Sequence, residues 1–288
     1  MTDTLKACLW MLGAVVSFSS MAVAGREVSF ELDTFEIMMY RSLIGVVVVL
    51  VVASSLGTLK TVQRADMHIH FLRNICHFTG QNLWFFALTL IPLAQLFALE
   101  FTTPLWVVIL SLLVLGEKVT KLRVLVAVAG FVGILMVTRP TAETLSIGTL
   151  TAAASAIFFA GSIVLTRKLT QTQSTTSILF WLVVLQAIFG LICAGLDGDI
   201  ALPSSNALPF LVVIGLAGLC AHLCLTTAVG LAPATVVVPI DFIRLPLIGV
   251  VGWVLYSEPV DIWVIAGALV IFGANYANIW SETRKGAA

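Results

Sequence analysis

Charged residues are scarce in this sequence, at 10% of 288 residues, whereas they make up about 25% of an ordinary soluble domain. A soluble domain of this length needs more charge to cover its surface, so the scarcity excludes an ordinary water-soluble fold. A glycine-rich phosphate-binding loop is also missing, which excludes a built-in ATP-driven motor. The net charge is zero, with 15 basic and 15 acidic residues, and this balance argues against a nucleic-acid partner.

Cysteine is also uncommon. The five cysteines are odd in number and lie mostly in apolar runs, which favours small packing residues over a disulfide framework or a metal site. Cys220, His222 and Cys224 fall in one apolar segment, but such neighbours do not have the ligand spacing of a zinc site. We therefore expect no bound metal and no cofactor.

Hydrophobic residues are abundant instead, at 60% of the chain, and the mean hydropathy is +1.09. A helix needs about 20 mostly apolar residues to cross a bilayer. The sequence therefore predicts an all-α integral membrane protein with ten transmembrane helices. They are expected at residues 5–25, 35–55, 70–90, 93–115, 121–138, 147–166, 176–196, 208–230, 234–256 and 260–280.

A weak internal repeat divides the chain. A shift of 141 positions without a gap places Arg26 on Arg167, Pro92 on Pro233, Glu100 on Asp241, Phe101 on Phe242 and Glu117 on Glu258. We therefore predict two five-helix repeats, at residues 1–140 and 146–288. Because five is odd, the second repeat enters the membrane from the opposite face, so the repeats are inverted. Inverted repeats are common in secondary transporters, which bind substrate near the midplane of the membrane.

Basic residues are unevenly distributed between the predicted loops. With the N-terminus assigned to the cytoplasm, eleven Lys and Arg residues fall on the cytoplasmic side and two, Arg26 and Arg139, on the opposite side. Cytoplasmic loops of membrane proteins carry such an excess. We therefore predict a multi-pass protein of the inner (cytoplasmic) membrane with both termini in the cytoplasm.

Four stretches carry a resemblance to a known superfamily. They are RSLIGVVVVL (41–50), LWFFALTLIPLAQLFALEFTTPLWVVILSLLVLGE (83–117), RP (139–140) and YSEP (256–259). With these stretches, nearly the whole chain resembles the drug/metabolite transporter superfamily in its ten-helix form with two EamA-type domains. The resemblance implies a central cavity lined mainly by helices 1, 3, 4, 6, 8 and 9, and alternating access without ATP or an ATPase subunit. It also implies cargo such as amino acids, vitamins, nucleotide-like metabolites or quaternary amines.

Four charged residues remain after the others are assigned to loops and to the ends of the predicted spans: Arg41, Glu100, Asp241 and Arg244. A charge at the bilayer centre costs at least about 2.5–3.5 kcal/mol, so each needs a structural or functional reason. Arg41 reaches a depth near Glu100, which makes it a candidate for a structural ion pair. Asp241 and Arg244 are three residues apart and can pair on one helical face.

The functional alternative is that Glu100, Asp241 and Arg244 line a substrate cavity. Arg244 would then hold a substrate carboxylate through two parallel hydrogen bonds. Glu100 or Asp241 would hold a substrate amine or take up a proton in each cycle. The pattern leaves the structural and the functional interpretation open.

Further candidates for the substrate site are polar or aromatic residues at a similar depth, each with a packing role as its alternative. They are Trp10, His77, Gln81, Asn82, Trp84, Phe158, Phe159 and His222. Glu117 and Glu258 are expected to be features of helix ends. Ser257-Glu258-Pro259 resembles a cap and first turn for the last helix.

Together these features predict a secondary active transporter for a small polar or zwitterionic metabolite, such as an amino acid or a derivative. We favour proton-coupled export. The alternative is a carrier or exchanger for a larger cofactor-like, nucleotide-like or quaternary-amine metabolite. An intramembrane enzyme that uses Glu100, Asp241 or His222 as acid and base is disfavoured by the absence of a nucleophile motif. The expected partners are a small-molecule substrate and the lipid bilayer.

Overall fold

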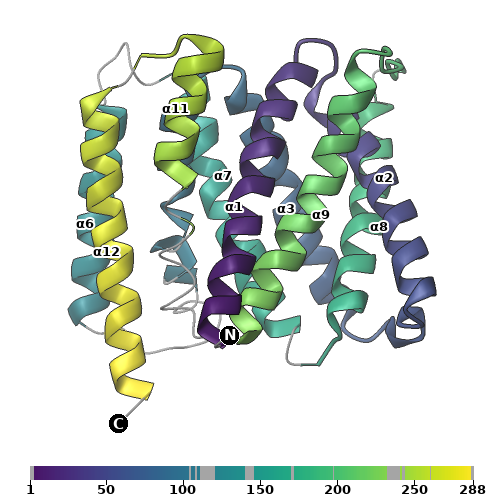
Figure 1. Cartoon of the computed structure of the whole chain (residues 1–288), viewed down its shortest axis with the longest axis horizontal. Coiled ribbons are helices and arrows are strands. Elements are labelled where there is room, and N and C mark those ends of the chain that lie inside the picture. Colours follow the sequence, from purple (N-terminus) through teal and green to yellow (C-terminus); the bar gives the residue numbers. More distant parts are fainter. Residues whose placement is uncertain are drawn as a thin grey trace.

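The computed structural model of the chain describes residues 3–103, 105–107, 109–110, 121–139, 146–169, 172–196, 198–231, 241, 244–259 and 261–286. Within these residues the chain forms ten α-helices and a short 3-10 helix, and no strand. They are α1 (Asp3–Val28), α2 (Thr34–Ser55), η1 (Leu59–Thr61), α3 (Met67–Leu88), α4 (Leu93–Glu100), α6 (Lys121–Thr138), α7 (Ile147–Leu169), α8 (Thr175–Ala194), α9 (Ala207–Leu231), α11 (Arg244–Tyr256) and α12 (Ile262–Gly286). The helices stand side by side as a bundle, with both chain termini at one end (Figure 1).

This arrangement confirms the predicted all-α membrane fold. Within the described residues, five helices are long and apolar enough to cross a membrane: α1, α2, α7, α8 and α9. The predicted spans 93–115 and 234–256 contain α4 and α11, and much of the remainder of each lies outside the described residues. α3 has the same length as α2, 22 residues, but it is more polar because it carries a row of buried polar side chains.

Four helix pairs make the most extensive contacts, and each joins the first half of the chain to the second. α1 packs on α9, α3 on α7, α2 on α8 and α6 on α12. In terms of the repeat, the first helix of each half packs on the third helix of the other half. The second helices of the two halves pack on each other, and so do the two fifth helices. A two-fold relation between the halves requires this pattern, which therefore fits an inverted repeat.

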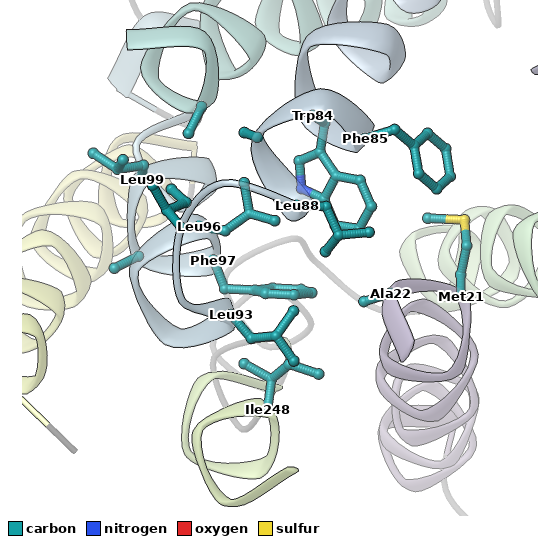
Figure 2. Packing of buried hydrophobic residues seen from close by; sticks show 14 of the residues in the cluster. Met21, Ala22, Trp84, Phe85, Leu88, Leu93, Leu96, Phe97, Leu99 and Ile248 are labelled. Carbon is teal, nitrogen blue, oxygen red and sulfur yellow. The ribbon is translucent and has the colours of Figure 1, made fainter. Parts of the chain in front are cut away.

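The largest hydrophobic core fills the end of the bundle away from the termini, hereafter the far end. α1 contributes Met21 and Ala22, α4 contributes Phe97 and α11 contributes Ile248 (Figure 2). Gly25 of α1 allows this close packing, because a Cβ there would lie 2.5 Å from a ring carbon of Phe85. The apolar side chains of these helices therefore close the centre of the bundle at the far end.

Polar contacts also fix the loops at this end. α2 begins at a capping box in which Asp33 accepts hydrogen bonds from the first turn and Glu36 accepts from the Asp33 backbone N–H. In the preceding loop, Glu31 accepts hydrogen bonds from the backbone and hydroxyl of Ser204, which hold the pKa of its carboxyl below the usual value. The loop before α2 is thereby attached to the loop before α9.

The crossing of α6 and α12 depends on two facing glycines. A Cβ at Gly133 would lie 2.9 Å from the Gly267 carbonyl oxygen, and a Cβ at Gly267 would lie 2.7 Å from the Gly133 carbonyl oxygen.

We expect Gly267→Ala to lower the free energy of unfolding by about 1–3 kcal/mol, the usual cost of overpacking. Thermal unfolding in detergent measures this change. Gly273→Ala is the control, since nothing lies within 4 Å of a Cβ there, and equal melting temperatures for the two variants would contradict the prediction.

Candidate functional site

Three charged side chains from the two halves of the chain meet inside the bundle. The Arg244 guanidinium lies 3.1 Å from a carboxylate oxygen of Glu100 and 3.1 Å from one of Asp241. The other Glu100 oxygen accepts a hydrogen bond from the Trp84 indole N–H at 2.8 Å. The Arg244 side chain is only 5% exposed. The expected pair of Asp241 and Arg244 is therefore present, and Glu100 joins it to form what we call the charged cluster.

Aromatic rings surround the cation of the charged cluster. The central carbon of the Arg244 guanidinium lies 4.9 Å from the ring centres of Phe18 and Phe97, and 5.1 Å from that of Phe101. A desolvated cation over a ring face gains about 2 kcal/mol. These contacts and the two carboxylates offset the cost of removing the guanidinium from water.

With both carboxylates ionised, the charged cluster has one negative charge more than its single cation can neutralise. Two carboxylates share one guanidinium, and an uncompensated carboxylate is costly inside a protein. Within the described part of the chain, one Asp241 oxygen, Oδ1, and the Arg244 Nε are buried without a hydrogen-bond partner. The cluster can therefore take up a proton or the positive group of a ligand.

A second set of buried polar side chains follows one face of α3. Arg73, His77 and Gln81 recur every fourth residue, which places them on one side of the helix, and all three are buried. Arg73 donates to the Thr166 hydroxyl of α7 at 3.0 Å, and the Gln81 side-chain oxygen accepts from Arg41 of α2. We call these three residues the polar row.

Rings connect the polar row to the charged cluster. The His77 ring lies 5.7 Å from the His222 ring of α9 and 6.1 Å from the Phe159 ring of α7, measured between centroids. The His222 ring lies 5.8 Å from the Phe18 ring, which also covers Arg244. Helices α1, α3, α7 and α9 thus bring several of the predicted site residues together.

In the structure Arg41 does not pair with Glu100, the partner that their similar depth suggested. Arg41 donates to Gln81 and lies 3.7 Å from the Met38 sulfur, whereas both Glu100 oxygens contact Arg244 or Trp84. Depth along a helix does not fix the direction of a side chain. α2 packs mainly on α8 and α9, so Arg41 reaches α3 instead of α4.

The remaining predicted residues have different surroundings. Asn82 donates to the Phe78 carbonyl of its own helix at 2.8 Å, and its buried side-chain oxygen has no hydrogen-bond partner in the residues that the structure describes. Trp84 is 2% exposed and contributes its N–H to the charged cluster. Trp10 and Phe158 are 40% and 37% exposed, and no described contact joins either to the charged cluster. Their part in the substrate site stays a prediction.

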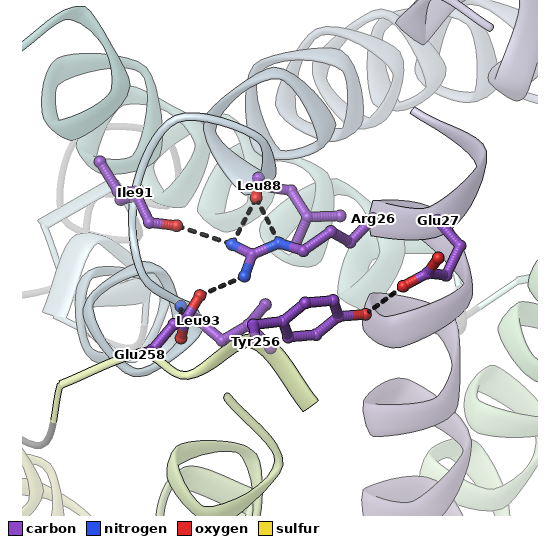
Figure 3. Close-up of polar contacts among 7 residues, drawn as sticks. All are labelled: Arg26, Glu27, Leu88, Ile91, Leu93, Tyr256 and Glu258. Atoms are coloured by element: carbon purple, nitrogen blue, oxygen red, sulfur yellow. Dashed lines mark hydrogen bonds and ion pairs between the residues drawn. The ribbon is translucent and has the colours of Figure 1, made fainter. Parts of the chain in front are cut away.

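Sequence reasoning missed a polar cluster at the far end (Figure 3). Arg26, in the last turn of α1, donates to the Leu88 carbonyl at 2.9 and 2.5 Å and to the Ile91 carbonyl at 2.7 Å. It also forms an ion pair with Glu258, whose other oxygen accepts the Leu93 N–H at 2.8 Å. This far-end cluster ties α1 to the α3–α4 turn and to the segment between α11 and α12.

Glu258 therefore caps a different helix from the one predicted. Its carboxylate receives the first N–H of α4, and Asp261 accepts the Trp263 N–H at the start of α12 at 2.8 Å. Gly252 makes room for Glu258, because a Cβ there would lie 2.3 Å from the Glu258 Oε2. Glu117, the equivalent residue in the first half, lies outside the described residues.

Two arginines were assigned to loops from the sequence and are in fact buried. Arg26 is 8% exposed and Arg73 is 4% exposed. α1 extends to Val28, beyond the predicted span 5–25, and so includes Arg26. Arg73 lies near the start of the predicted span 70–90, where α3 packs on α7. The polar residues at spacings of four along α3 were the available signal for Arg73. For Arg26 the signal was its match to Arg167 in the repeat.

These features define a multi-pass membrane transporter built from two interleaved halves. The chain belongs to the EamA-like transporter family, whose profile matches residues 5–139 and again residues 146–279. The family is a branch of the drug/metabolite transporter superfamily, as the sequence predicted.

Curated relatives have transporter names. The chain is 29% identical to an S-adenosylmethionine uptake transporter of Rickettsia conorii, over 99% of this chain and 97% of the relative. It is 27% identical to a riboflavin transporter of Vibrio cholerae, over 98% and 95% of the two chains. It is 28% identical to a pseudopaline exporter of Pseudomonas aeruginosa, over 99% of each chain.

A solved crystal structure has the same fold. It shares 19% sequence identity with this chain and superimposes with a TM-score of 0.67, covering 96% of this chain and 98% of the other. This likeness supports only the architecture of the helix bundle.

Proposed function

We propose that this protein is a secondary active transporter that exports a small amphoteric metabolite, such as an amino acid derivative, in exchange for protons. In this proposal it lies in the inner membrane with both termini in the cytoplasm, and residues 1–140 and 146–288 are its two inverted repeats. The charged cluster carries the proposal. It joins α4 of the first half to α11 of the second half, and it is short of one positive charge.

A proton and a substrate cation would compete for the same carboxylate. With Arg244 shared between Glu100 and Asp241, the remaining negative charge is neutralised either by protonation or by a substrate amine. Because the two cannot be present together, binding of one releases the other, which is the requirement for exchange. A proton gradient directed into the cell would then drive the substrate outward.

Alternating access requires the far end of the bundle to open and close. In this structure the far-end cluster and the apolar core around Phe97 hold it closed. Opening would separate Arg26 from Glu258 and from the carbonyls of the α3–α4 turn. We therefore assign to the far-end cluster the role of stabilising the conformation in which the far end is closed.

The second candidate is a carrier for a larger, flat cofactor-like metabolite. The three phenylalanine rings around Arg244 favour it, because aromatic faces stack on flat groups. The relatives named for S-adenosylmethionine uptake and for riboflavin also favour it. The relative named as a pseudopaline exporter favours export.

Flux into and out of liposomes tests the proposal. The purified protein is reconstituted and assayed with labelled amino acids, S-adenosylmethionine and riboflavin, with and without a pH gradient. We expect an amphoteric compound to cross, and its flux to rise with the gradient in the wild type. Asp241→Asn is expected to remove this rise, because the charge that admits a proton is lost. Transport of riboflavin alone, at a rate independent of pH, would favour the second candidate.

A further inference from the structure

We propose that Arg41 and Arg73, together with His77, form a binding site for the anionic oxygen group of the substrate. The site is distinct from the charged cluster, which takes the cationic group. This inference rests on the proposed transport of an amphoteric metabolite and extends it, because it assigns the two ends of the substrate to two places in the bundle.

Both arginines are paired with neutral groups. Arg41 donates to the Gln81 amide oxygen, and Arg73 donates to the Thr166 hydroxyl at 3.0 Å and to the Asn74 amide oxygen at 3.4 Å. Within the described residues, the ion pairs do not include either arginine. Since a cation within a membrane is normally paired, these two arginines are suited to an anionic ligand.

His77 supplies an unused hydrogen-bonding group between them. His77 is only 5% exposed, and among the described residues its buried Nε2 atom has no hydrogen-bond partner. Arg73 lies one turn before His77 on α3, and Gln81, which holds Arg41, lies one turn after it. Steps of four residues are about 6 Å along a helix axis, so the backbone positions of Arg73 and Gln81 lie about 12 Å apart with His77 midway between them.

The surroundings hold Arg41 in place. A Cβ at Gly218 of α9 would lie 2.9 Å from an Arg41 guanidinium nitrogen, so the glycine leaves room for the guanidinium. Gln81 fixes the same group from the side of α3. An arginine fixed in this way offers its remaining N–H groups to a carboxylate or a phosphate without a large loss of rotamer freedom.

The charged cluster and this anion site have opposite charge. Two carboxylates and one guanidinium leave the former with a negative charge, whereas Arg41 and Arg73 give the latter a positive charge. The Phe18 ring contacts both Arg244 and the His222 ring, and the His222 ring contacts His77. An amphoteric substrate is thus attracted at its two ends by two neighbouring regions.

The test compares two probes that differ only in a carboxylate, S-adenosylmethionine and its decarboxylated form, for binding to the full-length protein in detergent. Inorganic sulfate is a third probe, read from the melting temperature at constant ionic strength. We expect the wild type to bind the carboxylate form about ten-fold more tightly or better. Arg41→Gln is expected to remove this preference and to leave binding of the decarboxylated probe unchanged.

Two further variants separate recognition from folding. Arg41→Lys keeps the positive charge and is expected to retain part of the preference, although a point charge replaces the planar fork. Arg139→Gln removes an exposed arginine elsewhere and is expected to retain the full preference. Melting temperatures of all variants without a probe show whether each remains folded.

Each outcome decides a different claim. If both organic probes bind the wild type equally, or if Arg41→Gln keeps the preference, the anion site is overturned while the proposed transport function stands. If neither organic probe binds but sulfate stabilises the wild type and not Arg41→Gln, the anion site stands and S-adenosylmethionine fails as a substrate. If no probe binds, including sulfate, the anion site is overturned.

Discussion

Arg244→Met is expected to abolish transport and to destabilise the protein. The substitution keeps an unbranched side chain but leaves the buried carboxylates of Glu100 and Asp241 without their cation. Removing one partner of a buried ion pair costs about 3–5 kcal/mol, and Arg244 has two such partners together with three aromatic neighbours. Flux in proteoliposomes and thermal unfolding in detergent measure the two effects.

A compensated variant separates the structural effect from the functional one. Adding Glu100→Gln and Asp241→Asn to Arg244→Met removes both uncompensated charges, so most of the lost stability should return. Transport should remain absent, because the group that binds the proton or the substrate cation is gone. Wild-type flux in either variant would show that the charged cluster only stabilises the fold. Arg139→Met is the control for the loss of an arginine, since its side chain is 49% exposed.

The charged cluster also shows what the repeat could predict. Glu100 and Asp241 are equivalent under the shift of 141 positions, and the structure brings both to one guanidinium. Equivalent residues meet only near the axis that relates the two repeats, so this site lies near that axis. The residue equivalent to Arg244 is Thr103, which donates to the Glu100 backbone carbonyl. The two acids follow the repeat and the base does not, and this asymmetry produces the excess negative charge.

The helices were predictable because a long apolar run in lipid has few alternatives to a helix. The contacts of Arg41 were not, because depth in the membrane gives one coordinate and the direction around the helix axis is set by packing. α3 shows the same limit. Its polar residues at spacings of four lie on a common face, but only the packing of α3 on α7 shows that protein covers this face.

Glu258 shows a limit of local patterns. The stretch Ser257-Glu258-Pro259 has the composition of a helix cap, and Glu258 does cap a helix. The helix is α4, which begins 165 residues earlier in the chain. A local motif predicts the kind of interaction that a side chain makes, whereas the fold determines its partner.

Glu258→Gln is expected to open the far end of the bundle more often. The amide can still accept the Leu93 N–H, but the ion pair with Arg26 is lost. A cysteine at Ala22, which is 0% exposed in the far-end core, reports this opening when the five native cysteines are replaced. We expect its labelling by a membrane-impermeant thiol reagent in proteoliposomes to rise about ten-fold, which corresponds to about 1.4 kcal/mol. Phe30→Cys lies at a position that is 79% exposed. Its labelling measures the fraction of protein molecules whose far end faces the outside of the proteoliposome.

Two comparisons distinguish a shift between conformations from a general loosening. Arg139→Gln breaks an exposed ion pair with Asp261 at the same end and is expected to leave labelling at Ala22→Cys unchanged, because exposed pairs contribute about 0–1 kcal/mol. The repeat relates Arg26 to Arg167 and Glu258 to Glu117. If the two repeats exchange roles during transport, Glu117→Gln favours the conformation with the far end closed and lowers the labelling. A rise in labelling with both Glu258→Gln and Glu117→Gln would instead mean that each substitution merely loosens the bundle.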